Sequence, residues 1–125
     1  MVHNRMLNIE IKTIPHDEHR YPTTGDYFRD GKRLCLRISE MGNKKYELLV
    51  AVHELVERIL CESRGITDRE IDTFDMASAA NEPGDDPNSP YHREHVFASG
   101  IERLLAHELG VNWGDYESAI DRLYE

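Results

Sequence analysis

The chain has 125 residues and a mass of 14.5 kDa, which is the size of one domain (residues 1–125). Its 24 acidic and 15 basic residues leave a formal charge of −9. No cluster of Lys or Arg offers a surface for phosphates, which argues against a nucleic-acid partner. We also expect no membrane span and no secretory signal, and the two cysteines are too few for a disulfide framework. These features predict an acidic cytoplasmic protein.

Three strands are predicted in the first third of the chain. Apolar and polar residues alternate over 7–14, where Pro15 ends the strand, and further strands are expected over 25–29 and 33–39. Asp30-Gly31 tolerates the backbone of a two-residue turn and predicts a β-hairpin over about 25–39. The hairpin face predicted to pack against a helix carries Leu34, Leu36 and Ile38.

Helical spacing of apolar residues dominates the rest of the chain. Helices are expected over about 44–63, in a short turn over 70–74, from 89–90 to 110, and after Asn112, with a surface loop over 81–90. The predicted buried faces are Leu48, Val52, Leu55, Val56 and Ile59 in the first helix, and Phe97, Ile101, Leu104 and Leu105 in the third. The fold class is therefore α+β: a small antiparallel sheet followed by three or four helices.

One motif in the first helix carries the atoms of a metal site. His53 and Glu57 are four residues apart, so both side chains reach one point on the helix surface. An imidazole and a carboxylate both bind divalent metals, and Glu54 beside them could hold a metal-bound water. The pattern His-Glu-x-x-Glu arises by chance in roughly 8% of shuffled chains of this composition. An exposed helix face, with Glu54 paired to Arg58, is the alternative interpretation.

A third ligand has to come from another element. The segment from His92 to His95 is the best supply, and we take His95 or Glu94 as the candidates, although adjacent residues can hardly both reach one ion. Glu94 lies on the predicted apolar face, where a buried carboxylate needs a metal or an arginine as its partner. His92 and Asp75 are reserve ligands.

Two other groups of metal-binding residue types have simpler interpretations. His16 and His19 lie in a polar loop after Pro15, where a solvated turn is expected. Cys35 and Cys61 have no histidine at motif spacing and are expected to be small buried residues.

A hairpin followed by a helix with His-Glu resembles the zincin-like metallopeptidase superfamily, over roughly residues 33–63. The resemblance implies a minimal zincin-like domain in which His53 is a metal ligand and Glu54 is the general base. The superfamily's commonest pattern has a second His where this chain has Glu57, so Glu57 would be a ligand by substitution. The chain also resembles small proteins encoded in bacterial prophages.

Three functions are compatible with these patterns. The first is a metal-dependent hydrolase acting on a peptide or protein, with zinc as the expected metal and manganese or iron as alternatives. The second is a non-enzymatic phage accessory protein whose acidic surface meets a basic partner. The third is a magnesium-dependent nucleotide pyrophosphohydrolase, for which Glu54 and Glu57 supply an E-x-x-E motif, although such enzymes are all-helical.

Overall fold

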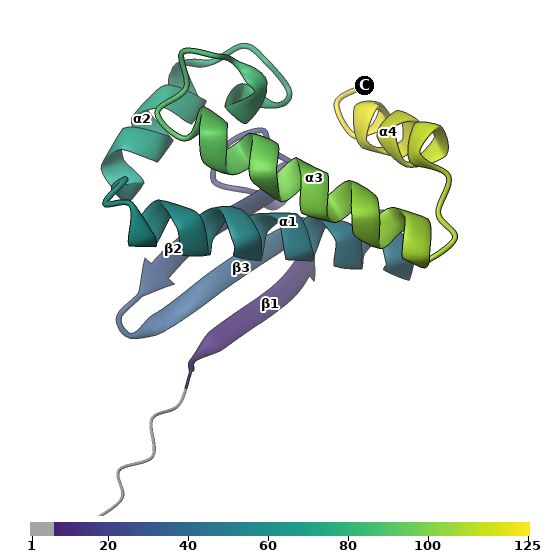
Figure 1. Ribbon diagram of the computed structural model, residues 1–125, viewed down its shortest axis with the longest axis horizontal. Helices are drawn as coiled ribbons and strands as arrows, with labels where there is room; N and C mark the ends of the chain where they lie inside the picture. The colour runs from purple at the N-terminus through teal and green to yellow at the C-terminus, as the bar shows by residue number, and fades with distance from the viewer. Residues whose placement is uncertain (1–6) are drawn as a thin grey trace, which may run out of the picture.

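The computed structural model describes residues 7–125 and shows an α+β fold (Figure 1), as predicted. A three-stranded sheet with the order β1-β3-β2 lies below the helices. The elements are β1 (Ile9–Ile14), β2 (Gly25–Asp30), β3 (Arg33–Ser39), α1 (Lys44–Ser63), α2 (Asp68–Ala77), α3 (His92–Glu108) and α4 (Trp113–Arg122), with 3₁₀ turns η1 (His16–Glu18) and η2 (Pro83–Asp85).

The predicted hairpin is confirmed as β2 and β3, which pair antiparallel. Asp30 pairs with Arg33, so the two turn residues are Gly31 and Lys32, one position later than expected. Gly31 has a φ of +61°, in the left-handed region that glycine adopts without strain. The residues predicted to face a helix, Leu34, Leu36 and Ile38, are all buried.

The sheet is mixed, because β1 pairs parallel with β3. The consecutive strands β1 and β2 do run in opposite directions, but β3 lies between them. The strand β1 therefore lies beside β3, which runs in the same direction. The prediction of an antiparallel sheet is correct only for the β2–β3 hairpin. The sequence pattern of β1 cannot distinguish these arrangements, because both alternate side chains between the two faces.

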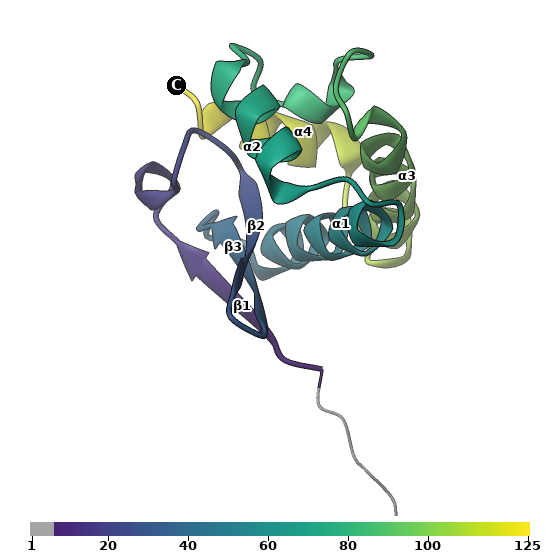
Figure 2. The same cartoon turned by 90° about the vertical axis from the view of Figure 1, so that its left-hand side faces the viewer.

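The helices build two further layers on the sheet. α1 crosses one face of the sheet, and α3 packs along α1 (Figures 1 and 2). Asn43 caps α1 by accepting a hydrogen bond from the backbone N–H of Tyr46. Thr67 and Glu70 form a reciprocal capping box on α2. These caps fix the residues at which α1 and α2 begin.

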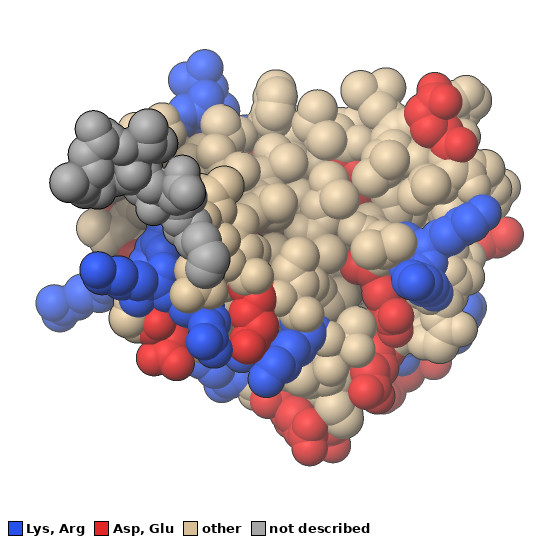
Figure 3. Space-filling model, turned by 90° about the horizontal axis from the view of Figure 1, so that it is seen from below, with Lys and Arg blue, Asp and Glu red and all other residues tan. Residues whose placement is uncertain are grey.

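The predicted buried faces of α1 and α3 are only partly correct: Leu55 and Leu105 are partly buried and pack against the core, but other predicted core residues are exposed. Leu48 and Ile59 are 49% and 55% exposed, and Phe97 and Leu104 are 55% and 68% exposed. Seen from below, a broad part of the surface shows few charged side chains (Figure 3). The buried positions include the polar residues of the motif. They are Leu49, Val50, Ala51, His53, Glu57, Arg58 and Cys61 in α1, and Glu94, His95, Ala98, Glu102 and Ala106 in α3.

The orientation of α1 about its axis predicts different losses of stability for alanine substitutions at two adjacent leucines. Leu49 is fully buried, whereas Leu48 is about half exposed. Leu49→Ala should lower the free energy of unfolding by about 2–4 kcal/mol, because it leaves a cavity in the core. Leu48→Ala is the matched control and should cost less than about 1 kcal/mol. Urea unfolding of both variants measures this, and equal losses would contradict the observed rotation of α1.

Candidate metal centre

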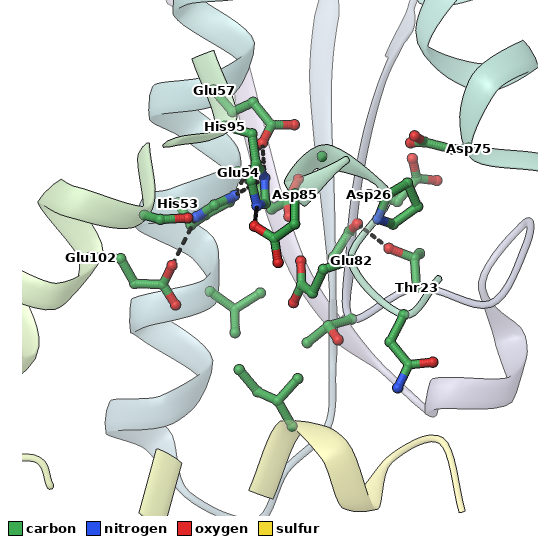
Figure 4. Close-up of a pocket in the computed structure, with 18 of the residues that line it drawn as sticks. Thr23, Asp26, His53, Glu54, Glu57, Asp75, Glu82, Asp85, His95 and Glu102 are labelled. Carbon is green, nitrogen blue, oxygen red and sulfur yellow. Dashed lines mark hydrogen bonds and ion pairs between the residues drawn. The ribbon is translucent and has the colours of Figure 1, made fainter. Parts of the chain in front are cut away.

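Three buried side chains from α1 and α3 converge on one point. Nε2 of His53 lies 3.0 Å from Oε2 of Glu57, and Nδ1 of His95 lies 2.9 Å from the same oxygen. The two ring nitrogens are 3.2 Å apart. The i and i+4 spacing on α1 brings the first pair together, and the first turn of α3 adds the third residue (Figure 4). The predicted ligands His53, Glu57 and His95 therefore form one cluster.

Two further carboxylates determine which ring nitrogens carry protons. Oε1 of Glu102 is 2.8 Å from Nδ1 of His53, and Oδ1 of Asp85 is 2.9 Å from Nε2 of His95. An ionised carboxylate only accepts hydrogen bonds, so each of these nitrogens must donate. The opposite nitrogen of each neutral ring is then a lone pair directed at Glu57. Metal-binding histidines have this arrangement, with the second nitrogen donating to a carboxylate.

Without a cation, the facing nitrogens of the two neutral histidines and the Glu57 carboxylate would be three acceptors with no donor between them. Either a metal ion or a second proton on a histidine ring can supply the missing positive charge. Burial by itself lowers the pKa of His53, but the hydrogen bonds with Glu102 and Glu57 outweigh it and raise that pKa well above its usual range. The pKa of His95 is also raised, because its bond to Glu57 outweighs burial. Burial would raise the pKa of Glu57, but the two histidines hold it at about 2.

The geometry of the cluster fits a metal ion. Ligand atoms about 2.1 Å from a tetrahedral ion are separated by about 3.4 Å. The three separations in the cluster are slightly shorter, so a small outward movement of the side chains would admit an ion. Among the described residues, His53, Glu57 and His95 are the group of this kind that could hold a metal.

Glu54 lies next to the cluster and faces a cavity of about 410 Å³ (Figure 4). The backbone of Gly25 on β2 packs against the Glu54 side chain, since a Cβ built on Gly25 would meet its Oε1 at 2.7 Å. Burial, followed by the charge of Glu57, raises the pKa of Glu54 well above its usual range. Glu54 thus has the position that was predicted for a residue acting on a metal-bound water.

The other candidate ligands are held elsewhere. Oε2 of Glu94 accepts a hydrogen bond of 2.6 Å from Arg64, so the buried carboxylate has an arginine as its partner and lies outside the cluster. Nδ1 of His92 lies 2.8 Å from the carbonyl oxygen of Gly84. Asp75 lines the same cavity, but it accepts hydrogen bonds from two hydroxyl groups, those of Tyr21 and Tyr91.

The remaining groups of metal-binding residue types have structural surroundings. His16 and His19 both lie 2.9 Å from the hydroxyl oxygen of the buried Ser39. These contacts hold the loop against β3, in contrast to the solvated turn that was predicted. Cys35 and Cys61 are buried free thiols, which confirms the prediction for both.

Sequence reasoning missed Glu102, Asp85 and Tyr116. The hydroxyl of Tyr116 donates a 2.5 Å hydrogen bond to Oε2 of Glu102, which fixes the carboxylate that orients His53. A signal for Glu102 was present, because it lies seven residues after His95 on a helix face that also carries Ala98. Asp85 gave no such signal, because a loop and a 3₁₀ turn place it.

Glu102→Gln tests the orientation of His53. The amide still reaches Nδ1, but it presents either a weaker acceptor or a competing donor, so His53 is less firmly held in the tautomer that binds metal. We expect zinc affinity to fall by about 10- to 100-fold. A competition titration with a fluorescent chelator measures this. Unchanged affinity would mean that Glu102 has no part in ordering the cluster.

Glu82 provides a pH test of the cavity. Burial raises its pKa to about 7 from an ordinary 4.5, so the fold disfavours its ionised form. The loss of stability caused by ionising Glu82 in the folded protein is absent below about pH 4.5 and complete above about pH 7. Above about pH 7, Glu82→Gln should therefore stabilise the protein by about 1–3 kcal/mol. Chemical unfolding of both proteins at pH 5 and pH 8.5 checks the sign, and a constant difference would contradict it.

Comparison with known proteins does not assign the chain to a family. No helix among residues 7–125 is both long and apolar enough to cross a membrane. The chain matches no protein-family model, and neither a curated protein nor a solved structure matches it.

Proposed function

We propose that this protein is a metal-dependent hydrolase of the zincin-like type that acts on a peptide or protein. The observation that carries the proposal is the convergence of the metal-binding nitrogens of His53 and His95 on Glu57. Each histidine has its second nitrogen bound to a carboxylate, as a metal ligand requires. An accessible cavity lies beside the cluster, so a substrate could reach the ion.

Zinc is the metal that this ligand set favours. Two histidines and one glutamate form a recurrent catalytic zinc site, in which water takes the fourth position. The same ligand set also suits iron(II), so the identity of the metal is part of the test. A bound ion would polarise the substrate carbonyl and acidify its water.

Glu54 supports a hydrolytic role for the centre. It follows His53 directly, yet its side chain faces the cavity and has no part in the three-residue cluster. A carboxylate in this position can accept the proton of an attacking water and return it to the leaving amine. The sheet argues against the nucleotide pyrophosphohydrolase alternative, which called for an all-helical fold.

Metal analysis and a peptidase assay on the same preparations test the proposal. Protein purified without a histidine tag should contain about one zinc per chain, and His95→Ala should contain much less. Wild-type protein should cleave a mixture of fluorescence-quenched peptides, lose the activity with a chelator, and recover it with zinc. Wild-type protein that neither retains nor binds zinc, iron or manganese would overturn the proposal.

A further inference from the structure

The cavity beside the metal centre is strongly acidic. It is lined by residues from the segment before β2, from β2, α1, α2, the 81–85 loop, α3 and α4. Five of its carboxylates already have partners: Asp26 binds Arg20, Asp75 binds two tyrosines, Asp85 binds His95, and both Glu57 and Glu102 bind His53. These groups fix the shape of the cavity, and their charges are at least partly balanced.

Four of the lining carboxylates have no such partner among the described residues: Glu117 and Asp121, which are exposed on α4, and Glu54 and Glu82, which are only partly exposed. The last two are the better enclosed pair. Neither side chain has a hydrogen-bond or ion-pair partner among residues 7–125, and both face the cavity (Figure 4). Protein surrounds both carboxylates and leaves them accessible from the cavity. A buried carboxylate without a partner is costly, and a cation in the cavity would relieve that cost.

Aromatic rings provide an independent indication of an organic cation. The cavity walls include Tyr21, Tyr91 and Trp113. The guanidinium of Arg103, at the edge of the cavity, already lies 5.4 Å from the centre of the Trp113 ring. Aromatic faces combined with carboxylates are the groups that proteins use to bind ammonium and guanidinium groups.

We propose that the cavity binds the basic side chain of a lysine or arginine in the substrate, with Glu82 as its main charged partner. The inference rests on the proposed function, in that it names the substrate class of the same site: peptides with a basic residue beside the scissile bond. The volume of about 410 Å³ is that of a site for a small organic group. The charge of the cavity thus favours a basic side chain, and its volume is large enough to hold one.

Binding of three small amides tests this without reference to catalysis. N-acetyl-lysine methylamide and N-acetyl-arginine methylamide are compared with N-acetyl-norleucine methylamide, which has an apolar chain and no charge. Calorimetric titrations use zinc-loaded protein and protein with excess chelator, at pH 8, above the pKa of about 7 that burial gives Glu82. We expect at least one basic probe to bind at least about tenfold more tightly than the neutral probe.

Glu82→Gln should remove most of this preference. Glu108→Gln is the matched control, because Glu108 is an exposed acid on α3 that does not line the cavity. Equal binding of basic and neutral probes, or equal behaviour of the two variants when both are folded, would overturn the inference. Basic probes that bind metal-free protein in the absence of any metal binding would support the cation site and overturn the proposed function. Zinc-dependent hydrolysis with no preference for basic probes would support the proposed function and overturn the cation site.

Discussion

Glu54→Gln should keep the metal and lose the hydrolysis. The amide has nearly the shape of the carboxylate, so it fits against Gly25, but it cannot accept a proton from water. Removing a general base costs about 10²- to 10⁴-fold in rate. The turnover number for a fluorescence-quenched peptide should fall by this factor, while zinc content and zinc affinity stay close to those of the wild type.

The control for this result is a carboxylate away from the site. Glu108→Gln also removes one acid, and its turnover number should equal that of the wild type. Glu54→Gln protein that retains zinc and full activity would show that another group accepts the proton. Glu54→Gln protein that no longer binds zinc would instead show that Glu54 is a ligand.

The parts of the fold that depend on neighbouring residues could be predicted from the sequence. The hairpin needs only alternation and a glycine turn, and the range of α1 follows from its cap and its helical pattern. The direction of β1 could not be predicted in the same way. It depends on β3 taking the place between β1 and β2, which is a long-range pairing that no local pattern specifies.

The rotation of α1 and α3 was predicted incorrectly because polar residues occupy buried positions on both helices. An apolar stripe usually marks the buried face of a helix, but here His53 and Glu57 occupy core positions and Leu48 is exposed. Burying a polar group is unfavourable unless it is hydrogen-bonded, and here the contacts among His53, Glu57, His95 and Glu102 join α1 to α3. When a polar cluster lies in the core, the apolar stripe of a helix no longer marks its buried face, so the stripe predicts the wrong rotation.

Zinc should stabilise the wild-type protein strongly and His53→Ala very little. The ligand cluster joins α1 to α3, and an ion that binds only the folded chain stabilises it by mass action. At a free zinc concentration of a thousand times the dissociation constant, the gain is about 4 kcal/mol. For a domain of this size, that gain corresponds to a rise in melting temperature of about 10–20 °C. Differential scanning fluorimetry with and without zinc measures the shift.

His107→Ala separates the site from general zinc binding. His107 is an exposed histidine on α3, so its loss should leave the zinc-induced shift unchanged. The shift of His53→Ala should be small, because two remaining ligands bind zinc far more weakly than three. Equal shifts in wild type and His53→Ala would place the zinc elsewhere, and the pair His16 and His19 beside Ser39 would be the next site to test. A shift that requires His53 and His95 but not His107 would assign the stabilisation to the cluster between α1 and α3.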